Sequence, residues 1–140
     1  MIEIKNLTFG YDGNIILKDL SLTIKEGEFV AIIGANGTGK TTLIKHLNAL
    51  LVPASGEVVV DGLDSRQHPR TIREKVGMLF QNPEDQLVHS MVEEDVAFGL
   101  ENQGVPSGEI QRRVKEVLER IGIAHLAKRN IAKPSRVTVW

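Results

Sequence analysis

The feature that most constrains this chain is a glycine-rich loop between an apolar segment and a helix-like segment. Residues 34–41 read Gly-Ala-Asn-Gly-Thr-Gly-Lys-Thr and match the pattern G-x-x-x-x-G-K-[ST]. Phe29 to Ile33, just before the loop, are all apolar, which is typical of a central parallel strand covered by helices. From Lys40 to Leu51, leucine and isoleucine recur with the period of a helix. The sequence therefore predicts a strand, a tight loop and a helix, in that order.

The residue types of the loop suit the binding of phosphate groups. Glycines let the backbone wrap closely around an anion, so that successive N–H groups point inward. The N-terminus of the following helix adds the positive end of its dipole. We expect Lys40 to reach the β- and γ-phosphates and the hydroxyl of Thr41 to ligate Mg²⁺. The nucleotide-binding residues predicted here are Gly34, Asn36, Gly37, Thr38, Gly39, Lys40, Thr41 and Thr42.

An accidental match to this pattern is rare, because at average residue frequencies a chain of this length contains it roughly once in two hundred cases. The alternative interpretation is a glycine turn that merely joins a strand to a helix. The apolar segment before the loop and the helical pattern after it favour phosphate binding. The motif alone does not choose among kinases, GTPases, helicases and transporter ATPases.

Alternating apolar residues indicate further strands, and the first of these has a slip in its alternation. Asp12-Gly13 is a dipeptide suited to a hairpin turn, because glycine accepts a positive φ. The predicted strands besides 29–33 are Ile2 to Phe9, Leu20 to Ile24, Glu57 to Val60 and Val76 to Phe80.

After Gln81 the pattern changes from strand to helix. Ser90 and Glu93 have the spacing of a capping box, which predicts a helix towards Gln103. A second helix is predicted to begin at Pro106-Ser107 and to end near Gly122. Its expected apolar stripe consists of Ile110, Val114, Val117, Leu118 and Ile121. Strands with a crossover helix, followed by helices, indicate an α/β core with a helical addition.

The composition argues against several functional classes. The 17 basic and 18 acidic side chains give a net charge of −1, without the basic excess typical of nucleic-acid binding. Cysteine is absent, so neither a disulfide nor a thiolate metal site is possible. No apolar run approaches the roughly 20 residues of a membrane helix, and no secretory signal is expected at the N-terminus. The four histidines have no metal-ligand spacing and are expected to be surface or packing residues: His46, His68, His89 and His125.

Segments on both sides of the loop resemble the ABC transporter ATPase family. In that family an aromatic residue ahead of the second strand stacks on adenine, and Tyr11 occupies the matching position, with Phe9 as a second candidate. The alternative for Tyr11 is a hairpin residue that packs on its neighbour. The resemblance implies a P-loop NTPase fold with ATP and Mg²⁺ as cofactors. The matching residues are Leu7-Thr8-Phe9-Gly10-Tyr11, Leu20-Ser21-Leu22-Thr23-Ile24, Gly27-Glu28, Gly34 to Thr42, Ser55-Gly56 and Asp61-Gly62.

The segment from Phe80 to Gly99 resembles a narrower group, the ATPases of energy-coupling factor importers, which take up cobalt, nickel or vitamins. Gln81 looks like the glutamine that contacts Mg²⁺ or the attacking water, rather than an ordinary turn residue. The resemblance implies that this segment meets a transmembrane subunit. Alternatively, the acidic residues within it only complement the dipole of a helix start: Glu93, Glu94 and Asp95.

The resemblance covers residues 1–132 and stops there. The family's Leu-Ser-Gly-Gly-Gln signature, catalytic glutamate and switch histidine are not found in this sequence. We therefore expect an incomplete domain, with an antiparallel β part at 1–28, half of the RecA-like core at 29–82, the start of the helical subdomain at 83–132 and an aberrant tail at 133–140. A truncated or frameshifted gene is one hypothesis. An unpaired apolar edge at Phe29 to Ile33 is expected to make the chain marginally stable and prone to aggregate.

The sequence thus favours an ATP-binding subunit of an energy-coupling factor importer. Intact relatives form homo- or heterodimers of ATPase subunits, and the resemblance implies a cytoplasmic location on the inner face of the membrane, through a membrane partner. Two alternatives stay open: a non-catalytic module that senses ATP, and an inert gene remnant. Without the general base alone, hydrolysis is expected to lose about 10²–10⁴-fold in rate.

Overall fold

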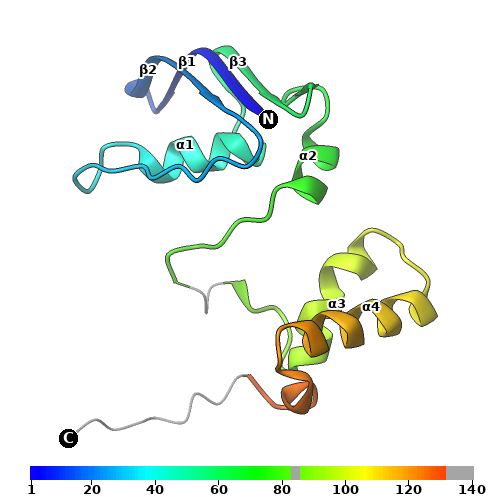
Figure 1. The fold of residues 1–140 in the computed structure, drawn as a ribbon. Coiled ribbons are helices and arrows are strands. Elements are labelled where there is room, and N and C mark those ends of the chain that lie inside the picture. Colours follow the sequence, from blue (N-terminus) through cyan, green and yellow to red (C-terminus); the bar gives the residue numbers. More distant parts are fainter. Residues whose placement is uncertain (83–85, 132–140) are drawn as a thin grey trace, which may run out of the picture. The chain divides into compact units, whose positions relative to one another are not determined.

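The computed structural model describes residues 1–82 and 86–131. These residues form two compact units, divided between Met78 and Leu79 (Figure 1). The first unit contains a β-sheet and two helices, and the second is helical. The expected tail at Lys133 to Trp140 lies outside the described residues, as do residues 83–85.

The first unit is built on a four-stranded antiparallel sheet in the order β2-β1-β3-β4. β1 and β2 form the predicted hairpin, in which Asp12 (φ 49°) and Gly13 (φ 82°) both adopt the left-handed conformation of a tight turn. Asp61-Gly62 makes a similar turn after the predicted strand Glu57 to Val60. The bounds of the strands are Ile2–Tyr11 for β1, Asn14–Ile24 for β2, Ser55–Val60 for β3 and Leu63–Asp64 for β4.

The slip predicted in the first strand is a β-bulge. Asn6 has a φ of 50°, and the pairing of β1 with β2 shifts between Ile4 and Leu7. Because an extra residue reverses the alternation of side chains, Ile4 and Leu7 both face the core and are almost fully buried.

Helix α1 (Lys40–Leu47) lies along one face of this sheet (Figure 1). Leu43 packs there with buried residues of three strands: Ile4, Leu7, Leu17 and Val58. The helix ends at Leu47 and not at Leu51 as predicted. Ala49 is left-handed (φ 55°), and the N–H groups of Leu50 and Leu51 both donate to the carbonyl of Lys45, which closes the helix.

Two of the predicted strands do not form. Neither Phe29 to Ile33 nor Val76 to Phe80 pairs with a strand in the described parts of the chain. Phe29 is 99% exposed and Ile33 is 92% exposed. The prediction of these two strands from apolar composition is therefore wrong for this structure, because a strand also needs neighbours that donate and accept backbone hydrogen bonds. Ile32 alone of the first segment packs against the sheet core.

Helix α2 (Pro69–Lys75) was not predicted from the sequence. The helix is short, and Ile72 is its one fully buried residue. Ile72 packs against Ala49 and Val60. Arg73 donates a hydrogen bond of 3.0 Å to the carbonyl of Ala49 and so ties α2 to the end of α1.

The second unit is a helical hairpin of α3 (Val92–Asn102) and α4 (Ser107–Arg120), followed by a 3-10 turn, η2 (Ala124–Leu126). Its core consists of Ala97, Ile110, Val114 and Leu118. The predicted stripe of α4 is narrower than expected, because Val117 is 40% exposed and Ile121 is 59% exposed. Gly122 (φ 78°) closes α4 as predicted: its N–H donates to Glu119, and that of Ile123 donates to Leu118.

The predicted capping box at the start of α3 is wrong. The N-cap residue is Met91, with no side-chain capping bond. The N–H groups of Val92 and Glu93 instead donate to the carbonyls of Arg129 and Ala127, so a returning backbone segment takes the place of the Ser90 hydroxyl. The Asp95 carboxylate accepts hydrogen bonds from the N–H groups of Val88 and His89 and holds the preceding loop.

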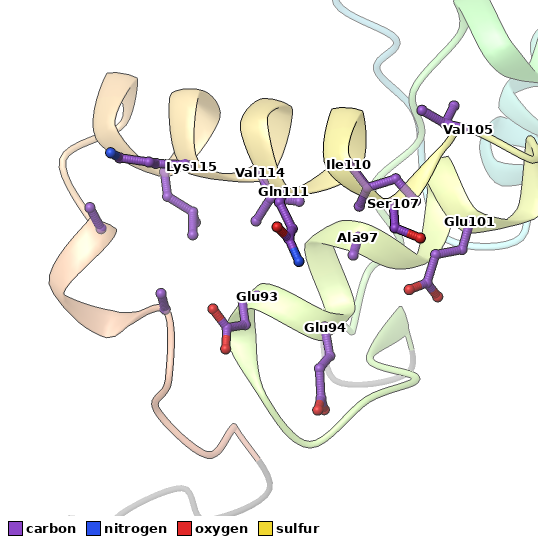
Figure 2. Close-up of a pocket in the computed structure, with 13 residues that line it drawn as sticks. Glu93, Glu94, Ala97, Glu101, Val105, Ser107, Ile110, Gln111, Val114 and Lys115 are labelled. Atoms are coloured by element: carbon purple, nitrogen blue, oxygen red, sulfur yellow. The ribbon is translucent and has the colours of Figure 1, made fainter.

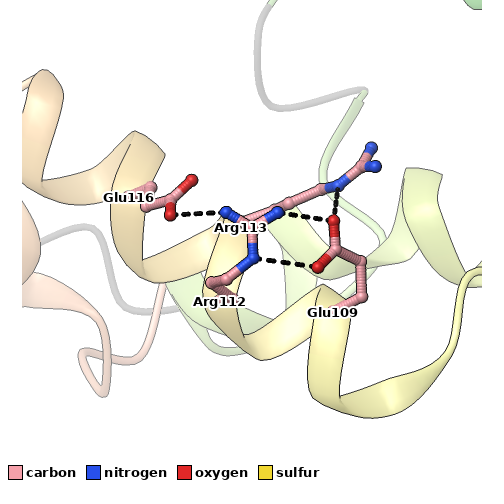
Figure 3. A network of polar contacts seen from close by, with 4 residues as sticks. All are labelled: Glu109, Arg112, Arg113 and Glu116. Carbon is pink, nitrogen blue, oxygen red and sulfur yellow. Dashed lines mark hydrogen bonds and ion pairs between the residues drawn. The ribbon is translucent and has the colours of Figure 1, made fainter.

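A network of ion pairs covers the outer face of α4 (Figure 3). Glu109 accepts from Arg112 at 2.6 and 2.9 Å and from Arg113 at 2.7 Å, and Arg112 also donates to Glu116 at 2.6 Å. These contacts join residues three or four positions apart, which are neighbours on a helix surface.

Candidate nucleotide-binding site

The glycine-rich loop precedes α1 and ends at its N-cap, Gly39. Gly37 (φ 82°) and Gly39 (φ 86°) are both left-handed, a conformation that side chains with a Cβ atom rarely adopt. The hydroxyl of Thr38 donates a hydrogen bond of 2.9 Å to the carbonyl of Ala35 and closes the loop on itself. The loop residues from Gly34 to Thr38 are exposed, so a ligand could reach this backbone.

Gly39 lies against strand β2. A Cβ atom built on Gly39 would stand 2.9 Å from Cγ2 of Ile16 and 3.0 Å from Cδ2 of Leu17. The last glycine of the loop therefore serves two purposes, a left-handed backbone and close packing of the loop on the sheet. The sequence motif indicated the first purpose but did not identify Ile16 and Leu17 as the surface that supports the loop.

Lys40 is the first residue of α1, and its side chain folds back over the loop. Its Nζ atom donates to the carbonyls of Gly34 and Ala35, each at 2.7 Å. The positive charge therefore lies across the loop, where the motif predicts phosphates. The first hydrogen bond of the helix runs from Leu43 to Gly39 at 2.8 Å, so the N–H groups of Lys40, Thr41 and Thr42 have no acceptor within the helix.

This arrangement fits a polyphosphate and its metal ion. Backbone N–H groups, the helix dipole and the Lys40 ammonium all favour an anion at the loop. Thr41 is exposed in the first turn, so its hydroxyl is accessible, whereas Thr42 is buried against the protein. Any contribution of Thr42 to the site would therefore come from its backbone and not from its side chain.

Tyr11 lies at the end of β1 and is 44% exposed. Tyr11 pairs with Asn14 across the hairpin. Asn14 is two residues before Ile16, which lies against the loop at Gly39. The ring of Tyr11 meets that of Phe9 edge to face, with centroids 5.0 Å apart. Tyr11 thus packs on its neighbour and still offers an exposed ring surface, so the two interpretations of this residue are compatible.

Gln81 is exposed and belongs to the second unit, whereas the loop and Tyr11 belong to the first. Thr41 and Thr42 therefore follow the loop directly on α1, and Tyr11 lies on the hairpin whose strand β2 supports the loop at Gly39. The role of Gln81 at the metal ion stays a prediction.

The comparison with protein families settles which nucleotide-binding proteins this chain resembles. The model of the ABC transporter family matches residues 17–138, which include the loop, α1 and both helices of the second unit. The chain belongs to the ABC transporter family.

Relatives of known name narrow the similarity further. An energy-coupling factor transporter ATP-binding protein of Symbiobacterium thermophilum is 54% identical over 81% of this chain and 40% of its own length. A cobalt import ATP-binding protein of Syntrophus aciditrophicus is 51% identical over 92% of this chain and 48% of its own length. This ABC transporter chain thus spans about half the length of the curated relatives it matches.

Solved structures agree with this assignment. The structure of cbiO1 from Clostridium perfringens, part of the ABC transporter complex cbiONQ, superimposes with a TM-score of 0.77 and 39% identity. It covers 92% of this chain, which covers 53% of that structure in turn. The α/β P-loop fold expected from the sequence is confirmed as a partial ABC ATPase domain.

The second unit of this ABC transporter chain has a cleft of about 710 Å³ between α3 and α4 (Figure 2). Ile110, Gln111 and Val114 project from α4 towards α3, over a floor that includes Ala97. Three carboxylates of α3 line the cleft, namely Glu93, Glu94 and Glu101. Acidic and apolar groups therefore occur together on the segment that follows Gln81.

Within residues 1–82 and 86–131, no helix is long and apolar enough to cross a membrane. In the same residues, no three histidine or acidic side chains form a group that could hold a metal ion.

Proposed function

We propose that this chain binds Mg-ATP as part of the ATP-binding subunit of an energy-coupling factor importer, for cobalt, nickel or a vitamin. The observation that carries this proposal is the loop at the N-terminus of α1, with Lys40 folded over it and first-turn N–H groups that have no acceptor within the helix. The similarity to energy-coupling factor and cobalt import ATP-binding proteins supports the choice of transporter.

Each proposed contact uses a group that the structure makes accessible. The loop N–H groups and Lys40 would bind the phosphates, for which Nζ must leave the carbonyls of Gly34 and Ala35. The hydroxyl of Thr41 would ligate Mg²⁺, and the metal ion would neutralise charge on the phosphate oxygens. The exposed ring of Tyr11 would stack on adenine. Gln81 would contact the metal ion or the attacking water.

The membrane partner is proposed to meet the second unit, through the segment that follows Gln81. Glu93, Glu94 and Glu101 stand beside the apolar cleft between α3 and α4. A partner segment with basic and apolar side chains would complement this surface. The chain would then lie on the cytoplasmic face of the membrane, and a second ATPase subunit, identical or different, would complete the transporter.

The decisive experiment for nucleotide binding is a calorimetric titration of the full chain with ATP in the presence and absence of Mg²⁺. We expect saturable binding to the wild type and a loss of at least tenfold in affinity for Lys40→Ala, because charge-assisted hydrogen bonds to phosphate contribute about 1.5–3 kcal/mol. Lys5→Ala, which removes an exposed lysine of β1, is the matched control and should bind normally. Equal affinity of Lys40→Ala and wild type would refute the proposal.

The partner contact is tested separately by copurification with the transmembrane subunit of an energy-coupling factor importer. Glu94→Lys reverses an exposed charge beside the cleft and should reduce the amount copurified, whereas Glu94→Gln should have a smaller effect. If Glu94→Lys copurifies as well as the wild type does, the cleft is not the contact surface.

A further inference from the structure

One buried titratable side chain near the loop has no part in the proposed contacts with ATP. His46 lies on α1, one turn after Thr42, and is fully buried. Its Nδ1 atom is 2.8 Å from the carbonyl oxygen of Thr42. Because a carbonyl only accepts hydrogen bonds, Nδ1 carries the proton of the neutral ring. The other nitrogen, Nε2, has no hydrogen-bond partner of good geometry within the described residues, although the backbone of Val52 also acts on the ring.

Packing alone is a poor explanation for a histidine at this position. A leucine would fill the same part of the core without burying the polar nitrogens of an imidazole. Burial also lowers the pKa of His46, against the opposing effect of the backbones of Thr42 and Val52. The ring therefore stays neutral over a wider pH range, and its single donor remains directed at Thr42.

The ring of His46 begins a chain of aromatic contacts that leads to the surface. Its centroid lies 4.6 Å from that of Phe9, with the ring planes at 75°. Phe9 in turn meets Tyr11 at 5.0 Å and 88°. Both are edge-to-face contacts, a favoured geometry for aromatic pairs. This series of contacts thus connects Thr42, at the end of the loop motif, with the exposed ring of Tyr11.

We propose that His46 is a positioning residue of the nucleotide site, which orients the ring of Tyr11 relative to the phosphate-binding turn of α1. The hydrogen bond to Thr42 fixes the imidazole, the imidazole fixes Phe9, and Phe9 fixes Tyr11. This inference rests on the proposed binding of ATP and adds a residue that acts on base recognition without touching the nucleotide.

The test separates base recognition from phosphate recognition. Affinities are measured for Mg-ATP and for magnesium tripolyphosphate, which has the phosphates but no base. His46→Asn retains a donor near the position of Nδ1 but lacks the ring that contacts Phe9. We expect it to weaken ATP binding about threefold to tenfold, the range expected for loss of one aromatic contact, and to leave tripolyphosphate within about twofold. Lys40→Ala should weaken both ligands.

A double-mutant cycle tests the connection to Tyr11. If His46 acts through Tyr11, then Tyr11→Ala combined with His46→Asn should bind ATP no more weakly than Tyr11→Ala alone. Phe9→Leu interrupts the same series of contacts without a change at His46. It should also weaken the binding of ATP and not that of tripolyphosphate, so the test does not depend on the folding of a single variant. Tyr11 is the single tyrosine of the chain, so its ring resonances should shift in each variant before any ligand is added.

The possible failures are distinguishable. If the wild type binds neither ligand, the proposed function fails, and this inference fails with it. If the wild type binds both but His46→Asn weakens them equally, or if the effects of Tyr11→Ala and His46→Asn add, the nucleotide site stands and the positioning role of His46 is overturned.

Discussion

The Nζ atom of Lys40 lies 2.7 Å from the carbonyl oxygen of Gly34. The ammonium group that the motif predicts to bind phosphates is therefore hydrogen-bonded to the loop itself. This contact is at the surface, where water can replace either partner. We therefore expect Lys40→Ala to lower the free energy of unfolding by no more than about 1 kcal/mol. Chemical denaturation of the variant and the wild type measures the difference. A loss of several kcal/mol would mean that any lost ATP binding reflects unfolding.

The two left-handed glycines of the loop should differ in their tolerance of a methyl group. Gly37→Ala introduces backbone strain of about 1–2 kcal/mol and meets no atom within 4 Å. Gly39→Ala adds contacts of 2.9 and 3.0 Å with Ile16 and Leu17, and overpacking of this kind costs about 1–3 kcal/mol more. Thermal unfolding should therefore rank wild type, Gly37→Ala and Gly39→Ala in falling order. Equal loss in the two variants would show that β2 does not support the loop.

Features set by neighbouring residues were predictable from the sequence. The Asp12-Gly13 turn, the bulge in β1, the left-handed Gly122 and the start of α1 at Lys40 all depend on residues within a few positions of one another. The loop belongs to this class too, because its glycines and Lys40 are consecutive along the chain. For that reason the candidate site is predictable from the sequence without any tertiary contact.

Features set by distant contacts were not predictable. The start of α3 is closed by carbonyls of Ala127 and Arg129, more than thirty positions away, and these override the capping box at Ser90. Phe29 to Ile33 is apolar enough for a strand but finds no hydrogen-bonding neighbour in the described residues. His46 was expected to be either a surface or a packing residue, and its contacts with Phe9 and Thr42 arise only when α1 packs on the sheet.

The exposed segment 29–33 should govern self-association more than stability. Phe29 is 99% exposed, so Phe29→Ser should change the free energy of unfolding by less than about 0.5 kcal/mol. It should also reduce concentration-dependent association, measured by sedimentation velocity, because an apolar edge is removed. Leu43→Ala is the buried control and should cost about 2–5 kcal/mol. A large loss of stability in Phe29→Ser would show that this segment is packed in solution.

The marginal stability expected of an incomplete domain has its own measurement. We expect the full chain to melt below about 45 °C, the lower end of the range for ordinary domains from mesophiles. Scanning calorimetry at several protein concentrations tests this. A cooperative transition above that temperature, independent of concentration, would contradict the expectation.

The ion pairs on α4 predict an acid-sensitive contribution to stability. Hydrogen bonds from Arg112 and then Arg113 lower the pKa of Glu109 from 4.5 to about 2. A carboxyl whose folded-state pKa is lowered stabilises the fold above its unfolded pKa, and this contribution disappears as the pH falls from about 4.5 to about 2. Denaturation at a series of pH values measures this contribution. Glu109→Gln should reduce the loss in free energy of unfolding between about pH 4.5 and pH 2. Glu119→Gln, whose lysine partner is 3.9 Å away, should reduce that loss less. If the two variants behave alike, the network has no such role.

The buried imidazole of His46 predicts a second pH dependence of stability, nearer to neutral pH than that of Glu109. Burial lowers the pKa of His46 below 6.5 in the folded chain, so between 6.5 and the folded-state pKa the unfolded chain binds more protons. The free energy of unfolding must then fall as the pH falls through this window, by no more than about 1.4 kcal/mol per pH unit for one group. The difference between wild type and His46→Asn, measured by denaturation from pH 8 to pH 5, should shrink as the solution becomes more acidic, because the variant has no ring to protonate. The carboxyls with shifted pKa, Asp61 and Glu109, titrate below this window in the folded chain. A difference that stays constant with pH would mean that the imidazole is accessible to protons in the folded protein, and the fixed neutral ring that orients Phe9 would then be excluded.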